Sequence, residues 1–140
     1  MKHFKLTSET KVNVFGVKLF QIELIIDCKW GKIGDKGGWI EKEDNISGDA
    51  WVYGNAMVYG DAWVYGDAWE KSPIQIKGTK HFVNECEKGV LKIGCHSFKF
   101  DKWKKNFKEI GKKEDYTEME IKEYELYIDL AIKLSKIKTA

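Results

Sequence analysis

Residues 48–69 read GDAWVYGNAMVYGDAWVYGDAW, a six-residue unit that runs through three full copies and most of a fourth. Glycine begins each unit, alanine stands third, and valine stands fifth in each full copy. A period of six fits neither an α-helix nor a simple alternating strand. It is typical of a β-solenoid, in which each unit forms one short strand and one corner. The Gly-Asp and Gly-Asn pairs suit the corners, because glycine adopts positive φ without strain.

Three such units make one triangular coil of 18 residues in this class of fold, so residues 18 apart are expected to stack. The predicted stacking pairs are Ile40 with Val58, Ile46 with Val64, and Trp51 with Trp69. Valine and alanine are expected to fill the interior, while the tryptophan and tyrosine beside each valine point outward. The pattern covers residues 38–70, which is fewer than two coils, so flanking segments and other copies of the chain are expected to cap it.

The segments on either side of the repeat predict a mainly β protein with an α+β cap. Residues 1–37 are expected to form an N-terminal β segment, and residues 71–140 a C-terminal α+β domain. The predicted strands are 4–7, 17–24, 74–77, 82–86 and 90–93, with a turn at 13–16. One helix is predicted over 101–110, ended by Gly111. A second is predicted from Thr117, where Glu120 completes a capping box, with an apolar stripe of Ile121, Tyr124, Tyr127 or Ile128, Ala131 and Leu134.

Composition and charge narrow the classes of function. The chain has 140 residues, and all 24 of its basic residues are lysine. Sequence-specific recognition of nucleic acid is disfavoured, because arginine is the usual reader of guanine edges. Residues 71–113 hold twelve lysines against four acidic residues, which favours an anionic partner there. No membrane helix or signal peptide is recognised, and three scattered cysteines form no disulfide framework, so a cytoplasmic protein is expected.

The outward aromatic stripe of the repeat would be a large exposed apolar patch, which monomers seldom tolerate. We therefore expect a homo-oligomer, with a trimer as the first hypothesis. The residues expected at its interface are Trp51, Tyr53, Met57, Tyr59 and Tyr65. An alternative use of the stripe is to stack a flat ligand such as a nucleobase, for which Trp63 and Trp69 are the candidates.

A second candidate site is the basic stretch Lys77-Gly78-Thr79-Lys80-His81, directly after the repeat. Backbone N–H groups of a tight turn, the Thr79 hydroxyl and the Lys80 ammonium could together hold an anion. The alternative is a solvated hairpin turn. A metal site at His81, Cys86, Cys95 and His96 is disfavoured, because no C-x-x-C pair is present. No cofactor is expected.

Residues Gly34–Ser47 and the Gly-Asp-Ala-Trp-Val-Tyr units that follow resemble a family of small phage and prophage proteins. The opening segment Phe4–Lys11, the stretch Lys77–His81 and the tripeptide Ile93–Cys95 are similar to that family as well. The resemblance implies a left-handed parallel β-helix, a C-terminal α+β domain and a phage setting. Members of the family often carry more repeat units than this chain.

Three functional hypotheses follow. The first is an oligomeric phage protein that sequesters a small anionic, nucleotide-like host signal without catalysis, as an anti-defence protein. The second is a structural or protein-interaction module. The third is an enzyme, either an acyltransferase of the hexapeptide-repeat type with His81 or His96 as general base, or a nucleotide-cleaving phosphodiesterase.

Overall fold

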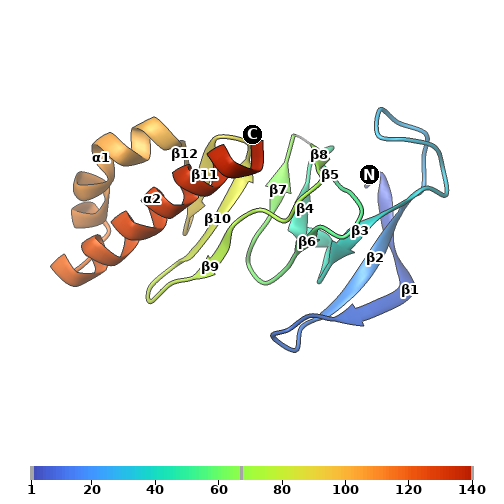
Figure 1. Cartoon of the computed structure of the whole chain (residues 1–140), viewed down its shortest axis with the longest axis horizontal. Coiled ribbons are helices and arrows are strands. Elements are labelled where there is room, and N and C mark those ends of the chain that lie inside the picture. The colour runs from blue at the N-terminus through green and yellow to red at the C-terminus, as the bar shows by residue number, and fades with distance from the viewer. Residues whose placement is uncertain (1, 67, 140) are drawn as a thin grey trace. The chain divides into compact units, whose positions relative to one another are not determined.

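The computed structural model describes residues 2–66 and 68–139, so the corner residue Asp67 lies outside the described residues. The chain is mainly strands followed by two C-terminal helices, an α+β class (Figure 1). It divides into two compact units, one ending at Pro73 and one beginning at Ile74, and each is described by itself. Within the part of the chain that the structure describes, no helix has the length and apolar character needed to cross a membrane.

The first unit contains eight described strands and one short 3-10 helix, Glu43–Asn45. The strands are β1 (Phe4–Val12), β2 (Lys18–Leu24), β3 (Lys36–Ile40), β4 (Ile46–Ser47), β5 (Trp51–Val52), β6 (Met57–Val58), β7 (Val64–Tyr65) and β8 (Ala68–Trp69). One sheet has the order β1-β2-β3-β6, and two further pairs, β4-β7 and β5-β8, involve the short strands of the repeat. The predicted N-terminal hairpin is confirmed, although β1 extends to Val12 rather than ending at Thr7.

Two of the three predicted stacking pairs are confirmed. Ile40 pairs with Val58 and Ile46 with Val64, in both cases between parallel strands. The third, Trp51 with Trp69, is wrong by one residue, because Trp51 pairs with Ala68 and Val52 pairs with Trp69. A strict spacing of 18 would pair Val52 with Glu70, at a position where the repeat would require valine. The shift leaves Glu70 exposed, which avoids burying an unpaired carboxylate.

The interior of the repeat is as the spacing predicts. Val52, Val58 and Val64 are fully buried, and the third-position alanines Ala50, Ala56 and Ala62 are buried beside them. All four glycines that begin the units have positive φ, between 53° and 72°. Glycine therefore serves at these corners because other residues would be strained there.

The prediction that Trp51 and Trp69 are exposed is wrong. Both indoles are buried, at 1% and 4% exposure. The N-terminal segment covers Trp51, because the His3 ring lies 5.9 Å from it and binds the Ala50 carbonyl oxygen at 2.8 Å. Gly37 also packs against this indole so closely that a Cβ there would lie 2.6 Å from it. Trp51 therefore belongs to the core of the first unit.

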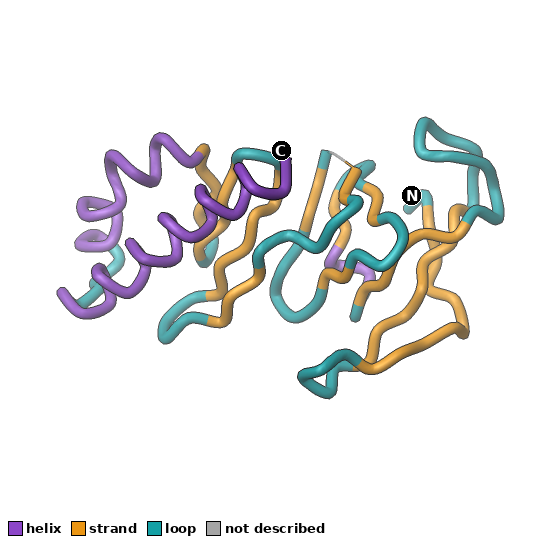
Figure 2. Tube along the Cα trace, viewed as in Figure 1, coloured by secondary structure: helices purple, strands orange, loops and turns teal. Residues whose placement is uncertain are grey.

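The second unit contains one antiparallel sheet and two helices (Figure 2). Its elements are β9 (Gln75–Lys77), β10 (Phe82–Glu87), β11 (Val90–Ile93), β12 (His96–Lys99), α1 (Phe100–Lys113) and α2 (Glu118–Thr139). The sheet order is β12-β11-β10-β9, and the sequence did not predict β12. The core between sheet and helices contains Val83, Leu91, Ile93, Trp103, Phe107, Tyr116, Ile121, Tyr124, Ile128 and Ala131.

The end of α1 corrects one prediction and the start of α2 confirms another. Gly111 does not end α1 but lies inside it and is buried, where a Cβ would be 3.3 Å from Ile121 of α2. The helix ends at Lys113 with Glu114 as its C-cap, the next residue Asp115 has φ 60°, and the Tyr116 N–H donates back to the Gly111 carbonyl oxygen at 2.9 Å. This is a Schellman end with aspartate in the left-handed position. The capping box of Thr117 and Glu120 is present in both directions.

Candidate binding site

The turn that joins β9 to β10, residues 78–81, folds tightly around the hydroxyl group of Tyr124. The backbone N–H groups of Lys80 and His81 both donate to this oxygen, and the hydroxyl donates to the His81 carbonyl oxygen at 3.0 Å. A Cβ on Gly78 would lie 2.5 Å from the same oxygen. Glycine is therefore required at position 78 because α2 approaches the turn so closely.

The anion that occupies this turn is a carboxylate of the chain itself. Thr79 donates its backbone N–H to Glu123 Oε2 at 2.9 Å and its hydroxyl to Glu123 Oε1 at 2.6 Å. Tyr127 donates a third hydrogen bond to Glu123 Oε2. The bond from the Thr79 side chain, followed by that from Tyr127, holds the pKa of Glu123 below its usual range. The donors expected to bind a phosphate are thus engaged by α2.

Lys80 caps the C-terminal end of α1. Its Nζ donates to the carbonyl oxygens of Glu114 at 2.9 Å and Asp115 at 3.1 Å, and it lies 4.9 Å from the centre of the Tyr116 ring. A cation here satisfies carbonyl groups that have no partner within the helix and opposes the negative end of its dipole. Lys77, the other lysine of the stretch, is exposed at the end of β9.

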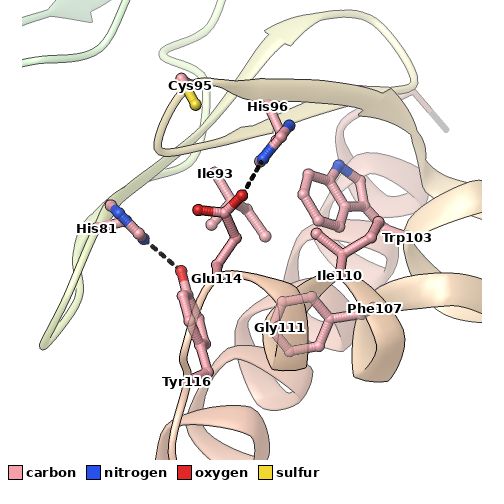
Figure 3. Close-up of a pocket in the computed structure, with 10 residues that line it drawn as sticks. All are labelled: His81, Ile93, Cys95, His96, Trp103, Phe107, Ile110, Gly111, Glu114 and Tyr116. Carbon is pink, nitrogen blue, oxygen red and sulfur yellow. Dashed lines mark hydrogen bonds and ion pairs between the residues drawn. The ribbon is translucent and has the colours of Figure 1, made fainter.

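Two of the three histidines, His81 and His96, line one small pocket of the second unit (Figure 3). The pocket is lined by His81, Ile93, Cys95, His96, Trp103, Phe107, Ile110, Gly111, Glu114 and Tyr116. The space that the centre of a water molecule can occupy in this pocket is about 20 Å³. That is room for roughly one water, so the pocket is too small for a nucleobase.

Each imidazole in this pocket has a protein partner. His96 Nε2 bonds Glu114 Oε1 at 2.9 Å, and His81 Nδ1 bonds the Tyr116 hydroxyl (Figure 3). The bond from His96 is the main cause that lowers the pKa of Glu114. Burial raises the pKa of Tyr116 well above its usual range, so its hydroxyl keeps its proton.

Replacing His96 by asparagine is expected to raise the pKa of Glu114 toward its ordinary value. A carboxyl whose pKa is lowered by folding stabilises the fold above its ordinary pKa, and this contribution is lost as the pH falls through the lowered value. The variant should therefore lose less stability than the wild type on acidification through this range. A carbon-detected NMR titration of Glu114 measures the shift directly, and an unchanged titration would contradict the assigned cause.

A larger hollow lies between α1 and α2. The space that the centre of a water molecule can occupy in this hollow is about 380 Å³. One wall carries Lys104, Lys105 and Lys108 of α1, and the other carries Glu125 and Asp129 of α2. The remaining lining residues are Trp103, Phe107 and Ile128. The volume lies within the usual range for small-molecule sites. We call this hollow the interhelical groove.

The remaining predicted site residues belong to the first unit. Tyr53, Met57, Tyr59, Trp63 and Tyr65 are all partly exposed. Trp63 lies 5.2 Å from Tyr65, ring centre to ring centre. Stacking of a base on Trp63 stays a prediction, whereas Trp69 is buried. Among the residues that the structure describes, no group of three or more His, Cys, Asp or Glu side chains is placed to hold a metal ion.

Sequence reasoning missed the residues that complete the turn and the small pocket, namely Glu114, Tyr116, Glu123 and Tyr124. The interhelical groove was also not predicted, although its three lysines belong to the basic block that was. A signal for the groove was available in the spacing of Lys104 and Lys108, which places both side chains on one face of a helix. Comparison of the chain with protein-family models, curated proteins and solved structures found no match.

Proposed function

We propose that this chain is a binding protein that captures a small anionic, nucleotide-like molecule in the interhelical groove and leaves it chemically unchanged. The observation that carries the proposal is the composition of the groove. Three lysines on one wall supply positive charge for a phosphate, and the largely buried rings of Trp103 and Phe107 also line the groove. The volume of about 380 Å³ suits a ligand of nucleotide size.

The opposite wall of the groove gives the ligand a second requirement. Glu125 and Asp129 repel an anion, but they accept hydrogen bonds from amino groups. A ligand with a phosphate at one end and a base that carries N–H groups at the other satisfies both walls. This favours a nucleotide over inorganic phosphate or a simple dicarboxylate.

The turn at residues 78–81 is expected to be a weaker binding site for the same ligand. A phosphate there would have to displace Glu123 from Thr79 and would compete with Tyr124 for the remaining N–H groups. Lys80 would also have to leave the carbonyl groups at the end of α1. Each of these exchanges subtracts from the free energy of binding.

The proposed biological setting is a phage-encoded protein in the host cytoplasm that sequesters a host defence signal. The resemblance of Gly34–Ser47 and the repeat to small phage proteins supports it. The same resemblance, with parallel pairs 18 residues apart, supports winding of the repeat as a left-handed β-helix. We also propose a homo-oligomer, with a trimer as first hypothesis, through the partly exposed residues Tyr53, Met57, Tyr59, Trp63 and Tyr65.

Calorimetric titration with a panel of mono-, di- and cyclic nucleotides tests the proposal. The Lys104→Ala, Lys108→Ala double variant is expected to bind the best nucleotide roughly tenfold more weakly. Asp129→Asn removes the charge from an acceptor for the N–H groups of the base and is expected to weaken nucleotide binding severalfold. Lys88→Ala changes an exposed lysine outside the groove and should leave binding unchanged.

The outcomes separate the hypotheses. Loss of binding in Lys80→Ala, with the double variant unaffected, would place the ligand at the turn. A converted nucleotide recovered after incubation would identify an enzyme instead. If no nucleotide binds the wild type below millimolar concentration, capture is wrong.

A structural or protein-interaction module is the second candidate, and one observation favours it. The turn that resembles an anion site has its N–H donors satisfied by Glu123 and Tyr124. Such internal satisfaction is what a rigid scaffold requires. Failure of every nucleotide in the titration would favour this candidate.

A further inference from the structure

Helix α2 carries an apolar stripe on the side opposite its buried face. Its buried residues include Ile121, Tyr124, Ile128 and Ala131, which belong to the core of the second unit. The outer stripe consists of Met119, Leu126, Leu130 and Ile137, which are 80%, 69%, 45% and 69% exposed. At 3.6 residues per turn, these four positions lie within about 20° of one line along the helix. Large apolar residues gathered on one exposed line mark an interaction surface.

Glu123 and Lys133 complete this outer line. Together the six positions are spaced by four, three, four, three and four residues, which is the a/d pattern of a coiled coil. Their order is also symmetric about Ile128. In an antiparallel pair of α2 helices, Met119 therefore lies opposite the second copy's Ile137, and Leu126 opposite the second copy's Leu130.

The two charged positions decide the orientation. In an antiparallel pair, Glu123 shares a layer with the second copy's Lys133, and the two-fold axis generates this pair twice. In a parallel pair, Glu123 would face Glu123 and Lys133 would face Lys133, which is repulsive in both layers. The charges outside the line agree, because acidic residues predominate in the first half of α2 and lysines near its end.

The side chains of Glu123 and Lys133 are both available for a contact between two copies. Glu123 is held in place by its bonds to Thr79 and Tyr127, which also keep its carboxylate ionised. Lys133 is exposed, and no partner for it is found among the described residues. A fixed carboxylate loses little side-chain entropy when a cation binds it.

We propose that α2 pairs with α2 of a second copy of this chain in antiparallel orientation, through the outer stripe and two Glu123–Lys133 contacts. The two-fold axis of the pair lies at the level of residue 128 along each helix, on the side of the outer stripe. Four apolar residues per copy bury little area, so we expect a dissociation constant on the order of 10–100 µM. This contact is separate from the interface proposed for the repeat.

Sedimentation equilibrium of the full chain between 5 and about 500 µM tests the pairing. Lys133→Glu places two carboxylates in each charged layer and should raise the dissociation constant at least tenfold. Leu130→Ser should weaken pairing by a similar factor. Lys88→Glu makes the same charge change on an exposed turn and should leave association unchanged. If the repeat also associates, Lys133→Glu should reduce the assembly to the oligomer that the repeat forms alone. The Lys104→Ala, Lys108→Ala variant, which tests nucleotide binding, should leave the mass unchanged.

Disulfide cross-linking tests the orientation, in a background in which Cys28 and Cys95 are serine. A mixture of a Met119→Cys chain and an Ile137→Cys chain should form cross-linked dimers, and neither chain alone should do so. Self-cross-linking of each variant alone would show a parallel pair and overturn the proposal. Association that is indifferent to both Lys133→Glu and Leu130→Ser, or a wild type that shows none, would overturn it as well.

Discussion

Val58→Asp is expected to unfold the first unit. Val58 is fully buried and pairs with Ile40 between the parallel strands β3 and β6. A carboxylate here would lie among the buried valines and alanines of the repeat, and burying it unpaired costs several kcal/mol. That cost is comparable with the whole stability of a small domain, about 5–15 kcal/mol. Thermal unfolding followed by circular dichroism should show the strand signal of this unit lost or strongly destabilised.

Two control variants separate the charge from other effects of substitution at this position. Val58→Ala removes only methyl groups and should cost about 2 kcal/mol. Asn55→Asp introduces the same carboxylate at an exposed corner of the same repeat and should change stability by less than about 0.5 kcal/mol. A Val58→Asp protein with the melting temperature of the wild type would show that the inside and outside of the repeat are assigned wrongly.

The interior of the repeat could be predicted because its determinants are local and periodic. The glycine corners, the inward valines and the pairing of Ile46 with Val64 all follow from a period of six and a coil of 18 residues. The burial of Trp51 could not be predicted in this way. It depends on His3 and Gly37, which are distant in sequence and belong to no repeat.

The C-terminal helices show the same division. The capping box of Thr117 was recognised because both of its partners lie within four residues. The sequence predicts a helix end at Gly111 because glycine is common there, but in the structure Gly111 lets Ile121 of the next helix approach. A signal in one helix does not reveal a requirement that another helix imposes on it.

The sequence predicts a tight turn at Gly78–His81 but not the partners of its N–H groups. In the structure the Thr79 N–H of this turn donates to a carboxylate, whereas the N–H groups of Lys80 and His81 donate to the Tyr124 hydroxyl. That anion is Glu123, which lies 44 residues beyond Thr79 in the sequence and reaches it only through the packing of α2. Glu118, Glu120 and Glu125 stand close to Glu123 in the same helix, so nothing in the sequence marked Glu123 as the partner of the turn.

Tyr124→Phe is expected to disorder this turn and to destabilise the second unit by about 3 kcal/mol. The Tyr124 ring is fully buried, and its hydroxyl accepts hydrogen bonds from the backbone N–H groups of Lys80 and His81. Phenylalanine fills nearly the same volume but leaves these N–H groups without their acceptor, and each orphaned group costs roughly 1–3 kcal/mol. Urea unfolding of the full chain measures the loss of free energy.

Hydrogen exchange at the backbone amides of Lys80 and His81 gives a local measure of the same effect. Both amides should exchange at least about tenfold faster in Tyr124→Phe, because a loss of about 1.4 kcal/mol of local stability is a factor of ten in the open population. Tyr127→Phe is the matched control, since its hydroxyl bonds only the Glu123 carboxylate among the contacts described. It should leave both amides protected and cost about 1 kcal/mol or less. Equal exchange rates in Tyr124→Phe and the wild type would show that the Tyr124 hydroxyl is not what protects these two amides, and would contradict the role assigned to it.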